Sequence, residues 1–146
     1  MQRIHDSDSK IESEIQAKGL TAPRVTPARI AEVIASEHYF TAGDGVYGAA
    51  AMEMLSRAGE DATLRAIGIC HIQPLRLLTF CVLVLRNGFT VTGESACASP
   101  ENFDAEIGRK IARENAVNKI WMLEGYLLKQ RLSEVPEDYA QPIYLG

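Results

Sequence analysis

Two arginines spaced four residues apart carry the clearest chemistry in the sequence. Arg109 and Arg113 lie in a stretch with helical periodicity, and side chains at positions i and i+4 are neighbours on one side of a helix. From Glu106 to Lys119 the chain has four basic and two acidic residues, although its formal net charge is −4. Such a guanidinium pair can hold a phosphate group through charge-assisted hydrogen bonds. The alternative is a solvated helix face on which Glu106 pairs with Arg109 and Lys110.

Polar and aromatic residues close to the arginines in the sequence offer further contacts. Thr92 and Ser95 lie on a predicted strand beside the arginine pair, where their hydroxyl groups can help to hold a phosphate. Phe89 either packs beneath the helix or offers a ring face on which a base can stack. Asn102 is expected at a helix start, whereas Asn115 is an amide in a helix interior, where asparagine is a weak helix former. Asn115 is therefore a candidate ligand residue.

The sequence offers little catalytic machinery. His5, His38 and His71 are scattered, and none has the Cys, Asp or Glu spacing of a zinc site. No phosphate loop, dinucleotide fingerprint or nucleophile elbow is present. The Gly-Glu-Ser run at 93–95 resembles a nucleophile site only superficially, because no histidine lies nearby in the sequence. We therefore expect a protein that is not an enzyme and that uses no metal ion or cofactor.

A β-hairpin is the element best placed to support these residues. Leu77 to Arg86 is apolar and rich in Val, Leu and Phe, as in a strand buried on both faces. Asn87-Gly88 predicts a two-residue turn, because both residues tolerate positive φ. The second strand, Phe89 to Ala96, alternates, with Phe89, Val91 and Gly93 on one face and Thr90, Thr92 and Glu94 on the other.

A long helix follows the hairpin, from about Pro100 to about Leu132. Ser99 is its predicted N-cap and Pro100 suits the first helical position. At 1.5 Å per residue the helix is about 50 Å long, which exceeds what one small sheet needs and indicates subunit contacts. Trp121 is expected to be buried near the centre of an apolar stripe made of Phe103, Ile107, Ile111, Val117, Trp121, Leu128 and Leu132.

The N-terminal half divides into an arm and the start of the main domain. Residues 1–25 are predicted to be an arm with a short helix at 11–17 that ends at Gly19. Thr26 and Pro27 then begin a helix with an apolar stripe of Ile30, Val33 and Ile34. An extended segment at 37–41, closed by Gly43-Asp44-Gly45, comes next. Residues 46–74 are expected to be an insertion, with a helix at 49–55 that Gly59 ends and a short strand or helical turn at 64–72.

These elements predict an α+β fold: a small antiparallel sheet built on the hairpin, packed against the long C-terminal helix, with N-terminal helices. The chain has 146 residues, of which 47% are hydrophobic and 23% charged, so residues 26–146 are expected to form a single domain after the arm. The composition excludes a disordered or collagen-like chain, and the acidic charge argues against coating nucleic acid.

Compartment is predicted from the apolar segments and the cysteines. The run from Leu75 to Leu85 is too short to span a bilayer, and the polar start of the chain is unlike a secretory signal. Cys70, Cys81 and Cys97 are an odd number with no metal-site spacing, which favours a reducing cytosol. We expect an intracellular protein without membrane contacts.

The residues of the hairpin and the long helix resemble one family. The strings are NGFTVTGESAC at 87–97, NFD at 102–104, EIG at 106–108, IA at 111–112, ENA at 114–116, KIW at 119–121 and LEGYLL at 123–128. They are similar to the small bacteriophage proteins of the N4 Gp49/Sf6 Gp66 type, and to the first Thoeris anti-defence family of phage sponge proteins. The resemblance covers 77–132, with a weaker echo in SEHYF at 36–40, and leaves out 46–74.

This resemblance implies a binding protein without a reaction, in the cytoplasm of the infected bacterial host. Sponge-family members sequester cyclic ADP-ribose isomers of Thoeris, and some also hold cyclic trinucleotides of CBASS at a distinct site. They assemble as dimers and, in some cases, as trimers of dimers. The chemical groups of such a ligand fit the residues singled out above: Arg109 and Arg113 for the pyrophosphate, Phe89 for the base, and Thr92, Ser95, Asn102 and Asn115 for hydroxyl groups.

Two other functions fit the same residues. A nucleic-acid-binding or regulatory phage accessory protein would use the arginines on phosphates, although the acidic chain lacks interleaved basic and aromatic residues. A hydrolase that degrades the signal would use Glu94 or His38.

Overall fold

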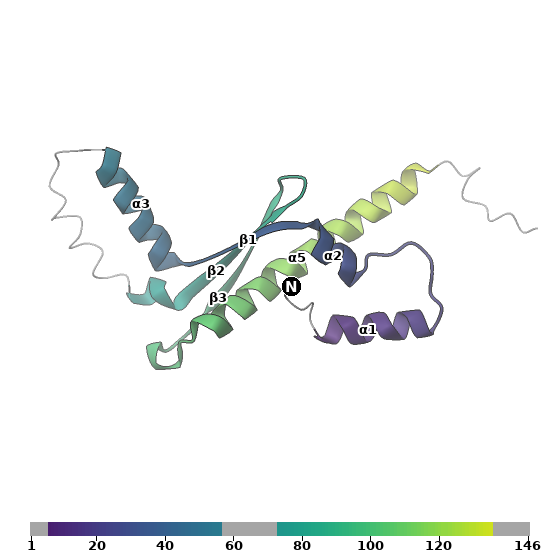
Figure 1. The fold of residues 1–146 in the computed structure, drawn as a ribbon, viewed down its shortest axis with the longest axis horizontal. Helices are drawn as coiled ribbons and strands as arrows, with labels where there is room; N and C mark the ends of the chain where they lie inside the picture. Colours follow the sequence, from purple (N-terminus) through teal and green to yellow (C-terminus); the bar gives the residue numbers. More distant parts are fainter. Residues whose placement is uncertain (1–5, 57–72, 136–146) are drawn as a thin grey trace, which may run out of the picture. The chain divides into compact units, whose positions relative to one another are not determined.

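The computed structural model describes residues 6–56 and 73–135. The chain forms two compact units, one of Ile34–Val117 and the other of Met1–Val33 with Asn118–Gly146. The elements are α1 (Asp6–Ala17), α2 (Pro27–Val33), β1 (Ile34–Thr41), α3 (Ala42–Ser56), the 3₁₀ turn η1 (Gln73–Leu77), β2 (Leu78–Leu85), β3 (Thr90–Ala96), the 3₁₀ turn η2 (Pro100–Asn102) and α5 (Ala105–Glu134) (Figure 1). The predicted α+β class is confirmed.

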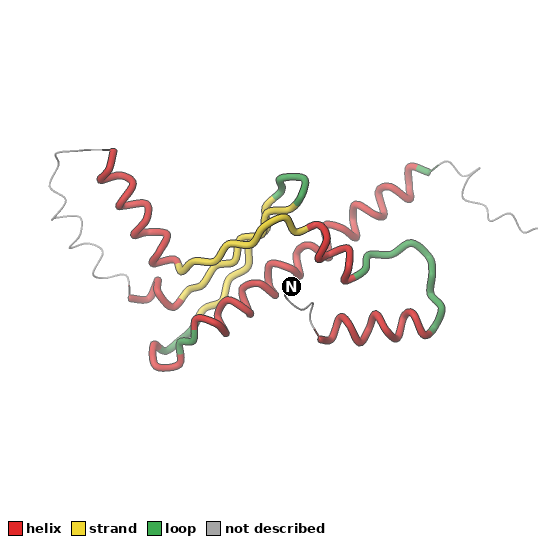
Figure 2. The backbone as a smooth tube through the Cα atoms, viewed as in Figure 1, coloured by secondary structure: helices red, strands yellow, loops and turns green. Residues whose placement is uncertain are grey.

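The three strands form one antiparallel sheet in the order β1-β2-β3 (Figure 2). The extended segment predicted at 37–41 is therefore confirmed as part of β1, and the predicted hairpin is β2 with β3. Cys81 at the centre of β2 lies opposite Tyr39 of β1 and Gly93 of β3. Because side chains alternate along a strand, these three residues share one face of the sheet.

The hairpin turn differs from the two-residue turn that Asn87-Gly88 predicted. Gly88 has a positive φ of 86°. Within the described ranges only glycines have a positive φ, so Asn87 lies outside the left-handed region. The Gly88 amide donates to the Leu85 carbonyl (2.9 Å), and the Leu85 amide donates to the Phe89 carbonyl (2.8 Å). Arg86, Asn87 and Gly88 thus form a three-residue loop, in which only its last residue needs left-handed backbone.

β2 is buried on one face only, which corrects the prediction of burial on both. Thr79, Cys81, Leu83 and Leu85 are buried, whereas Leu78, Phe80, Val82 and Val84 are half-exposed. The buried face is the one that α5 covers, as the contact of Gly108 with Thr79 shows. The half-exposed face includes Phe40 and Phe80, whose rings stack with centroids 5.7 Å apart.

α5 packs on the sheet through its smallest residues. A Cβ atom on Gly93 of β3 would collide with the Ala112 carbonyl oxygen and the Ala116 amide nitrogen. A Cβ atom on Gly108 would lie 3.0 Å from Thr79 Oγ1. The helix backbone therefore lies almost against the strands, and Gly108, Ala112 and Ala116 are buried.

The apolar stripe that was predicted to bury Trp121 lies on the side of α5 opposite to Gly108, Ala112 and Ala116. Ile107 and Ala116 are nine positions apart, which is two and a half turns at 3.6 residues per turn, so they point in opposite directions. Ile107 is 56% exposed and Ile111 44%, and Trp121 is half-exposed rather than buried. The prediction failed because large apolar residues were expected in the core, whereas the close contact with Gly93 admits only small ones.

The helix boundaries follow local capping. α5 begins at Ala105 rather than Pro100, and its cap is Asp104, which accepts a hydrogen bond from the Ile107 amide (2.9 Å). Ser99 precedes only the short turn η2 and makes no side-chain capping bond.

The glycine-rich run at 43–45 belongs to the first turn of α3 and does not close β1 as predicted. The Asp44 amide donates to Thr41 Oγ1 (3.1 Å), and Asp44 Oδ2 accepts from the Thr41 amide (2.9 Å). This reciprocal cap starts the helix directly after the strand. The helix predicted at 49–55 is confirmed within α3, which is longer.

Part of the predicted insertion lies outside the described residues, including the helix end at Gly59 and the strand or turn at 64–72. The assignment of 46–74 as an insertion stays a prediction.

The second unit contains α1, α2 and the C-terminal part of α5. The helix predicted at 11–17 begins earlier, at Asp6, and Gly19 follows it with a positive φ of 64°. Thr26 Oγ1 accepts from the Arg29 amide (3.1 Å), which confirms the predicted start of α2. Ile30 and Val33 are buried as predicted, but Ile34 belongs to β1. The arm and the single domain at 26–146 stay predictions. Within 6–56 and 73–135, no helix is long and apolar enough to cross a bilayer.

Candidate functional site

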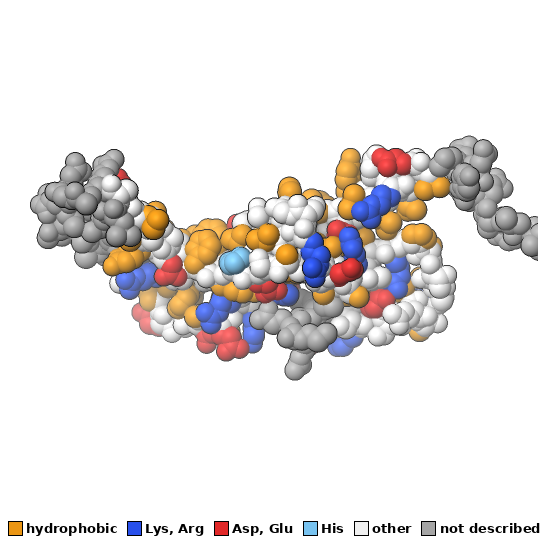
Figure 3. Space-filling model, turned by 45° about the horizontal axis from the view of Figure 1, so that its top comes forward, with side chains coloured by type: hydrophobic (Ala, Val, Ile, Leu, Met, Phe, Trp, Pro, Cys, Tyr) orange, Lys and Arg blue, Asp and Glu red, His pale blue; other side chains and the backbone are white. Residues whose placement is uncertain are grey.

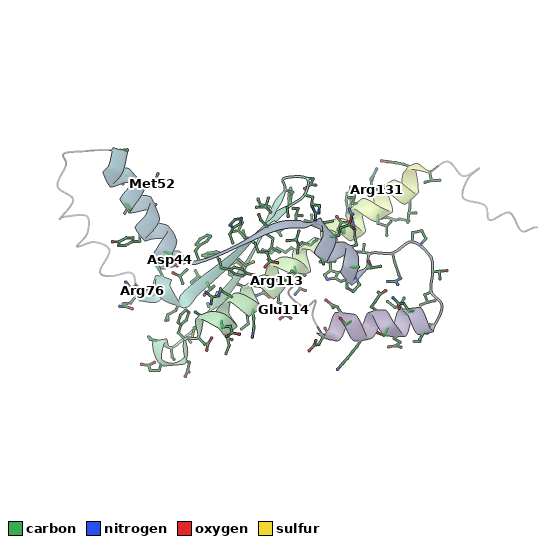
Figure 4. All side chains as sticks on the ribbon, viewed as in Figure 1. Asp44, Met52, Arg76, Arg113, Glu114 and Arg131 are labelled. Carbon is green, nitrogen blue, oxygen red and sulfur yellow. The ribbon has the colours of Figure 1, made fainter. Side chains whose placement is uncertain are left out.

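Arg113 lies at the centre of a half-buried ion-pair cluster between α5 and β1 (Figure 4). Its Nε donates to both carboxylate oxygens of Glu37 (3.0 and 3.1 Å), and its Nη2 donates to Glu37 Oε1 (2.8 Å). The two side chains are 19% and 23% exposed. Charged groups that are this well shielded, with several hydrogen bonds between them, form a firm pair rather than a fluctuating surface contact.

The alternation of β1 builds the other half of this cluster. Glu37 and Tyr39 are two residues apart on the strand and therefore share its covered face. The Tyr39 hydroxyl donates to Glu37 Oε2 (2.7 Å), and Tyr39 lies opposite Cys81 of β2. We call Glu37, Tyr39, Cys81 and Arg113 the Arg113 cluster. Ser36 and His38 lie on the opposite face, where the Ser36 hydroxyl and His38 Nε2 are hydrogen-bonded (3.0 Å).

The protonation states of the cluster are fixed near neutral pH. Burial alone would raise the pKa of the Glu37 carboxyl, but the hydrogen bonds from Arg113 and Tyr39 outweigh it and hold that pKa below its ordinary value. Burial and the hydrogen bond to Glu37 raise the pKa of the Tyr39 hydroxyl. Burial raises the pKa of the Cys81 thiol to about 11. Glu37 is therefore ionised and the other two groups are neutral at pH 7, a state suited to holding charge rather than to transferring protons.

Arg109, one helical turn before Arg113, is exposed and makes no ion pair or hydrogen bond within residues 6–56 and 73–135. Glu106 pairs with Lys110 (2.8 Å), so that part of the solvated-face alternative is confirmed, but it leaves Arg109 out. The two arginines thus differ. Arg113 is held by Glu37, whereas Arg109 is exposed to solvent and its guanidinium has no partner among the described residues.

Arg113 keeps donors for a ligand despite its ion pair. A guanidinium has five N–H groups, and Glu37 takes one on Nε and one on Nη2. The remaining three, two of them on Nη1, have no partner among the described residues. These N–H groups are available to an anionic oxygen, and the exposed Arg109 lies one helical turn away along α5. The Arg113 cluster with Arg109 is our candidate site.

The other predicted ligand residues lie at separate places in the chain. Asn115 Nδ2 donates to the Glu94 main-chain oxygen (2.8 Å) at β3, away from β1. Ser95 is half-buried on the covered face of β3, and Thr92 is exposed on the other face. The fold of the chain therefore does not gather these three residues around the arginine pair.

Phe89 and Asn102 are at opposite ends of β3. The seven residues of this strand span roughly 20 Å at about 3.3 Å per residue. Phe89 is 54% exposed at the hairpin loop, so it does not pack beneath the helix, and its ring face is open. The assignment of all seven residues to one ligand stays a prediction.

Sequence reasoning missed Glu37 and Tyr39. The available signal was the alternation in SEHYF at 36–40, which puts an acid and a tyrosine on one face of a strand. It did not identify their partner, because Arg113 is 76 residues away in the chain.

The comparisons with known proteins agree with the hairpin and helix strings. The model of the phage protein (N4 Gp49/phage Sf6 gene 66) family matches residues 25–132, and the chain belongs to this family. No curated protein and no solved structure matches it. The match confirms the resemblance to the N4 Gp49/Sf6 Gp66 type, and its range includes residues 46–74, which the predicted resemblance left out. The resemblance to the Thoeris sponge proteins stays a prediction.

Proposed function

We propose that this phage-family protein is an anti-defence sponge. It binds a cyclic nucleotide immune signal, a cyclic ADP-ribose isomer of Thoeris or a cyclic oligonucleotide of CBASS, and does not cleave it. The observation that carries the proposal is the arginine pair of the candidate site. Arg113 is fixed with three N–H groups unused, and Arg109 lies exposed one turn away. Two guanidinium groups one helical turn apart can each pair with one phosphate of a pyrophosphate.

The chemistry of the cluster supports binding rather than a reaction. A general acid or base works best with a pKa near the operating pH, whereas the pKa values of Glu37, Tyr39 and Cys81 are all shifted away from neutrality. A phosphate held by Arg113 would therefore meet no group ready to exchange a proton. The sponge needs no metal ion and no cofactor to act.

A second copy of the chain is part of the proposal. Stoichiometric capture of a signal requires nanomolar affinity, about −12 kcal/mol, and an enclosed site of low dielectric strengthens the charged contacts. The outward side of α5 exposes Ile107 and Ile111, which are 56% and 44% accessible, and Figure 3 shows hydrophobic side chains at the surface of the face it displays. We propose a dimer, with a trimer of dimers as the larger assembly, in the cytoplasm of the infected host. Light scattering that gave 16.0 kDa at micromolar concentration would contradict the dimer.

Titration calorimetry of the Arg109→Ala variant tests the proposed site. The ligands are a cyclic ADP-ribose isomer and a cyclic trinucleotide, measured separately. Losing a guanidinium that pairs with a desolvated phosphate costs about 2–5 kcal/mol, so affinity should fall about 30-fold to several thousand-fold. Lys110→Ala is the matched control. It removes the same charge from the neighbouring residue, whose side chain pairs with Glu106.

Three results would count against the proposal. A parent protein that binds neither ligand contradicts the sponge function. Equal affinity of Arg109→Ala and the parent removes the site assignment. Binding of a DNA or RNA oligomer, with an affinity that falls steeply as salt rises, favours a nucleic-acid-binding accessory protein instead.

A further inference from the structure

We infer that Glu37 and Tyr39 are positioning residues, which hold the Arg113 guanidinium in place for an anionic group of the ligand. The inference rests on the proposed function and concerns how the same site is prepared. The contacts form a chain across two elements: the Tyr39 hydroxyl donates to Glu37, and Glu37 accepts three hydrogen bonds from Arg113.

The base of this chain is rigid. Glu37 lies opposite Leu83 and Tyr39 opposite Cys81 in the β1–β2 ladder, and both β2 residues are fully buried. The carboxylate is thus fixed by the strand backbone and by the Tyr39 hydroxyl. Arg113 rises from α5 one residue after Ala112, which packs against Gly93. Both ends of the ion pair are therefore anchored beside buried residues, Leu83 opposite Glu37 and Ala112 next to Arg113.

The orientation of the ion pair favours positioning over blocking. Glu37 takes the Nε side of the guanidinium and one N–H of Nη2, and it leaves both N–H groups of Nη1 unused. An anion can bind this second edge without displacing the carboxylate. Holding a long side chain in its binding rotamer before the ligand arrives removes an ordering cost that binding would otherwise carry.

Two variants that leave every charge in place test the inference. Glu37→Asp keeps the carboxylate but withdraws it by one methylene group, and Tyr39→Phe removes only the hydroxyl that fixes Glu37. Affinities for a cyclic ADP-ribose isomer and for inorganic pyrophosphate are measured by titration calorimetry. Ordering one free side chain costs enough to lower affinity about two- to tenfold, so we expect Glu37→Asp to fall in this range and Tyr39→Phe to shift in the same direction. Ser36→Ala, on the other face of β1, is the control and should bind as the parent does.

Repeating both variants in an Arg113→Ala background separates positioning from a general structural effect. If they act through Arg113, they cause no further loss of affinity once Arg113 is gone. The amide exchange of buried residues, followed alongside, reports whether each variant folds. If the Tyr39→Phe and Glu37→Asp proteins both fold and both keep full affinity for the ligand, the inference is overturned. A loss of affinity that is as large without Arg113 as with it also overturns the inference. A rise in affinity does so as well.

The two probes distinguish this inference from the proposed function. A parent that binds pyrophosphate but no cyclic nucleotide contradicts the sponge function, and the variants still decide the role of Glu37 on pyrophosphate. A parent that binds cyclic nucleotide equally well with and without the Glu37 and Tyr39 changes keeps the function and loses the inference. A parent that binds neither probe overturns both.

Discussion

Replacing Gly93 by alanine should be among the most damaging single-methyl additions in the protein. The new Cβ atom would overlap the Ala112 carbonyl oxygen and the Ala116 amide nitrogen, which are backbone atoms of α5 and cannot rotate away as a side chain can. Relief therefore requires α5 to move off the sheet, with loss of the contacts that bury Leu83 and Val91. Overpacking of a core costs about 1–3 kcal/mol and occasionally more, and a clash with helix backbone belongs at the upper end of that range. We expect a loss of at least about 3 kcal/mol in the free energy of unfolding, a large part of the roughly 5–15 kcal/mol of a typical domain.

Urea denaturation followed by circular dichroism measures this loss. Gly125→Ala is the matched control, because it adds the same methyl group to α5 at a position with no heavy atom within 4 Å. Alanine in a helix interior is favoured over glycine by about 1 kcal/mol, so the control should gain stability. A Gly93→Ala protein as stable as the parent would refute the close contact between β3 and α5.

Three further outcomes follow from the same contacts. Thr79→Val should raise the free energy of unfolding by about 1–3 kcal/mol in thermal melts, because the buried Thr79 hydroxyl has no partner within the described residues and valine replaces it by an apolar group of similar shape. A destabilised variant would show that the hydroxyl is satisfied. Arg113→Ala should lower the free energy of unfolding by about 1–3 kcal/mol, since it leaves the half-buried Glu37 carboxylate with only one donor. Arg109→Ala should change it by less than about 0.5 kcal/mol. Equal effects in urea titrations would contradict the difference between the two arginines. The folded-state pKa of Glu37 lies below its ordinary value of 4.5, so the stability that the ionised carboxylate contributes is present above pH 4.5 and is lost as pH falls through the folded pKa. Acid titration should therefore destabilise the parent more steeply than Glu37→Gln. Parallel stability curves for the two proteins would contradict the shift.

Much of the fold was predictable because local rules determine it. The Thr26-Pro27 pair predicted the start of α2, and the apolar run before Asn87-Gly88 predicted β2 and its hairpin. Each of these depends on residues within a few positions of one another. The predicted type of turn was wrong because Asn87-Gly88 suits two turns. It fits a two-residue loop, and it also fits a three-residue loop in which a type I turn is followed by a glycine in the left-handed region.

The packing of α5 was not predictable from periodicity. Hydrophobic periodicity places the largest apolar side chains in the core, which is correct when a helix packs at an ordinary distance. Here Gly93 brings the strand against the helix backbone, and only Gly108, Ala112 and Ala116 fit between them. The sequence contains both stripes, and the choice between them depends on a contact between residues far apart in the chain. The exposed position of Ile107 and Ile111 follows from the same contact.

The candidate site was predictable only in part, for a similar reason. The arginine spacing identified Arg109 and Arg113 as a pair, but it did not predict that Arg113 is half-buried in an ion pair. Its half-burial follows from the pairing of β1 with β2, which turns Glu37 toward α5. An ion pair between strand and helix depends on the register of the sheet, and no pattern within either segment encodes it.

Recovery of the captured molecule tests the central claim most directly. The protein is incubated with a cyclic ADP-ribose isomer, freed of unbound nucleotide and denatured by heat, and the released material is analysed by chromatography with mass spectrometry. The sponge function predicts that the intact cyclic nucleotide returns in stoichiometric amount, and that the Arg109→Ala protein releases less of it than the parent does. Recovery of a linearised or hydrolysed product, or of no nucleotide from the parent protein, would contradict it.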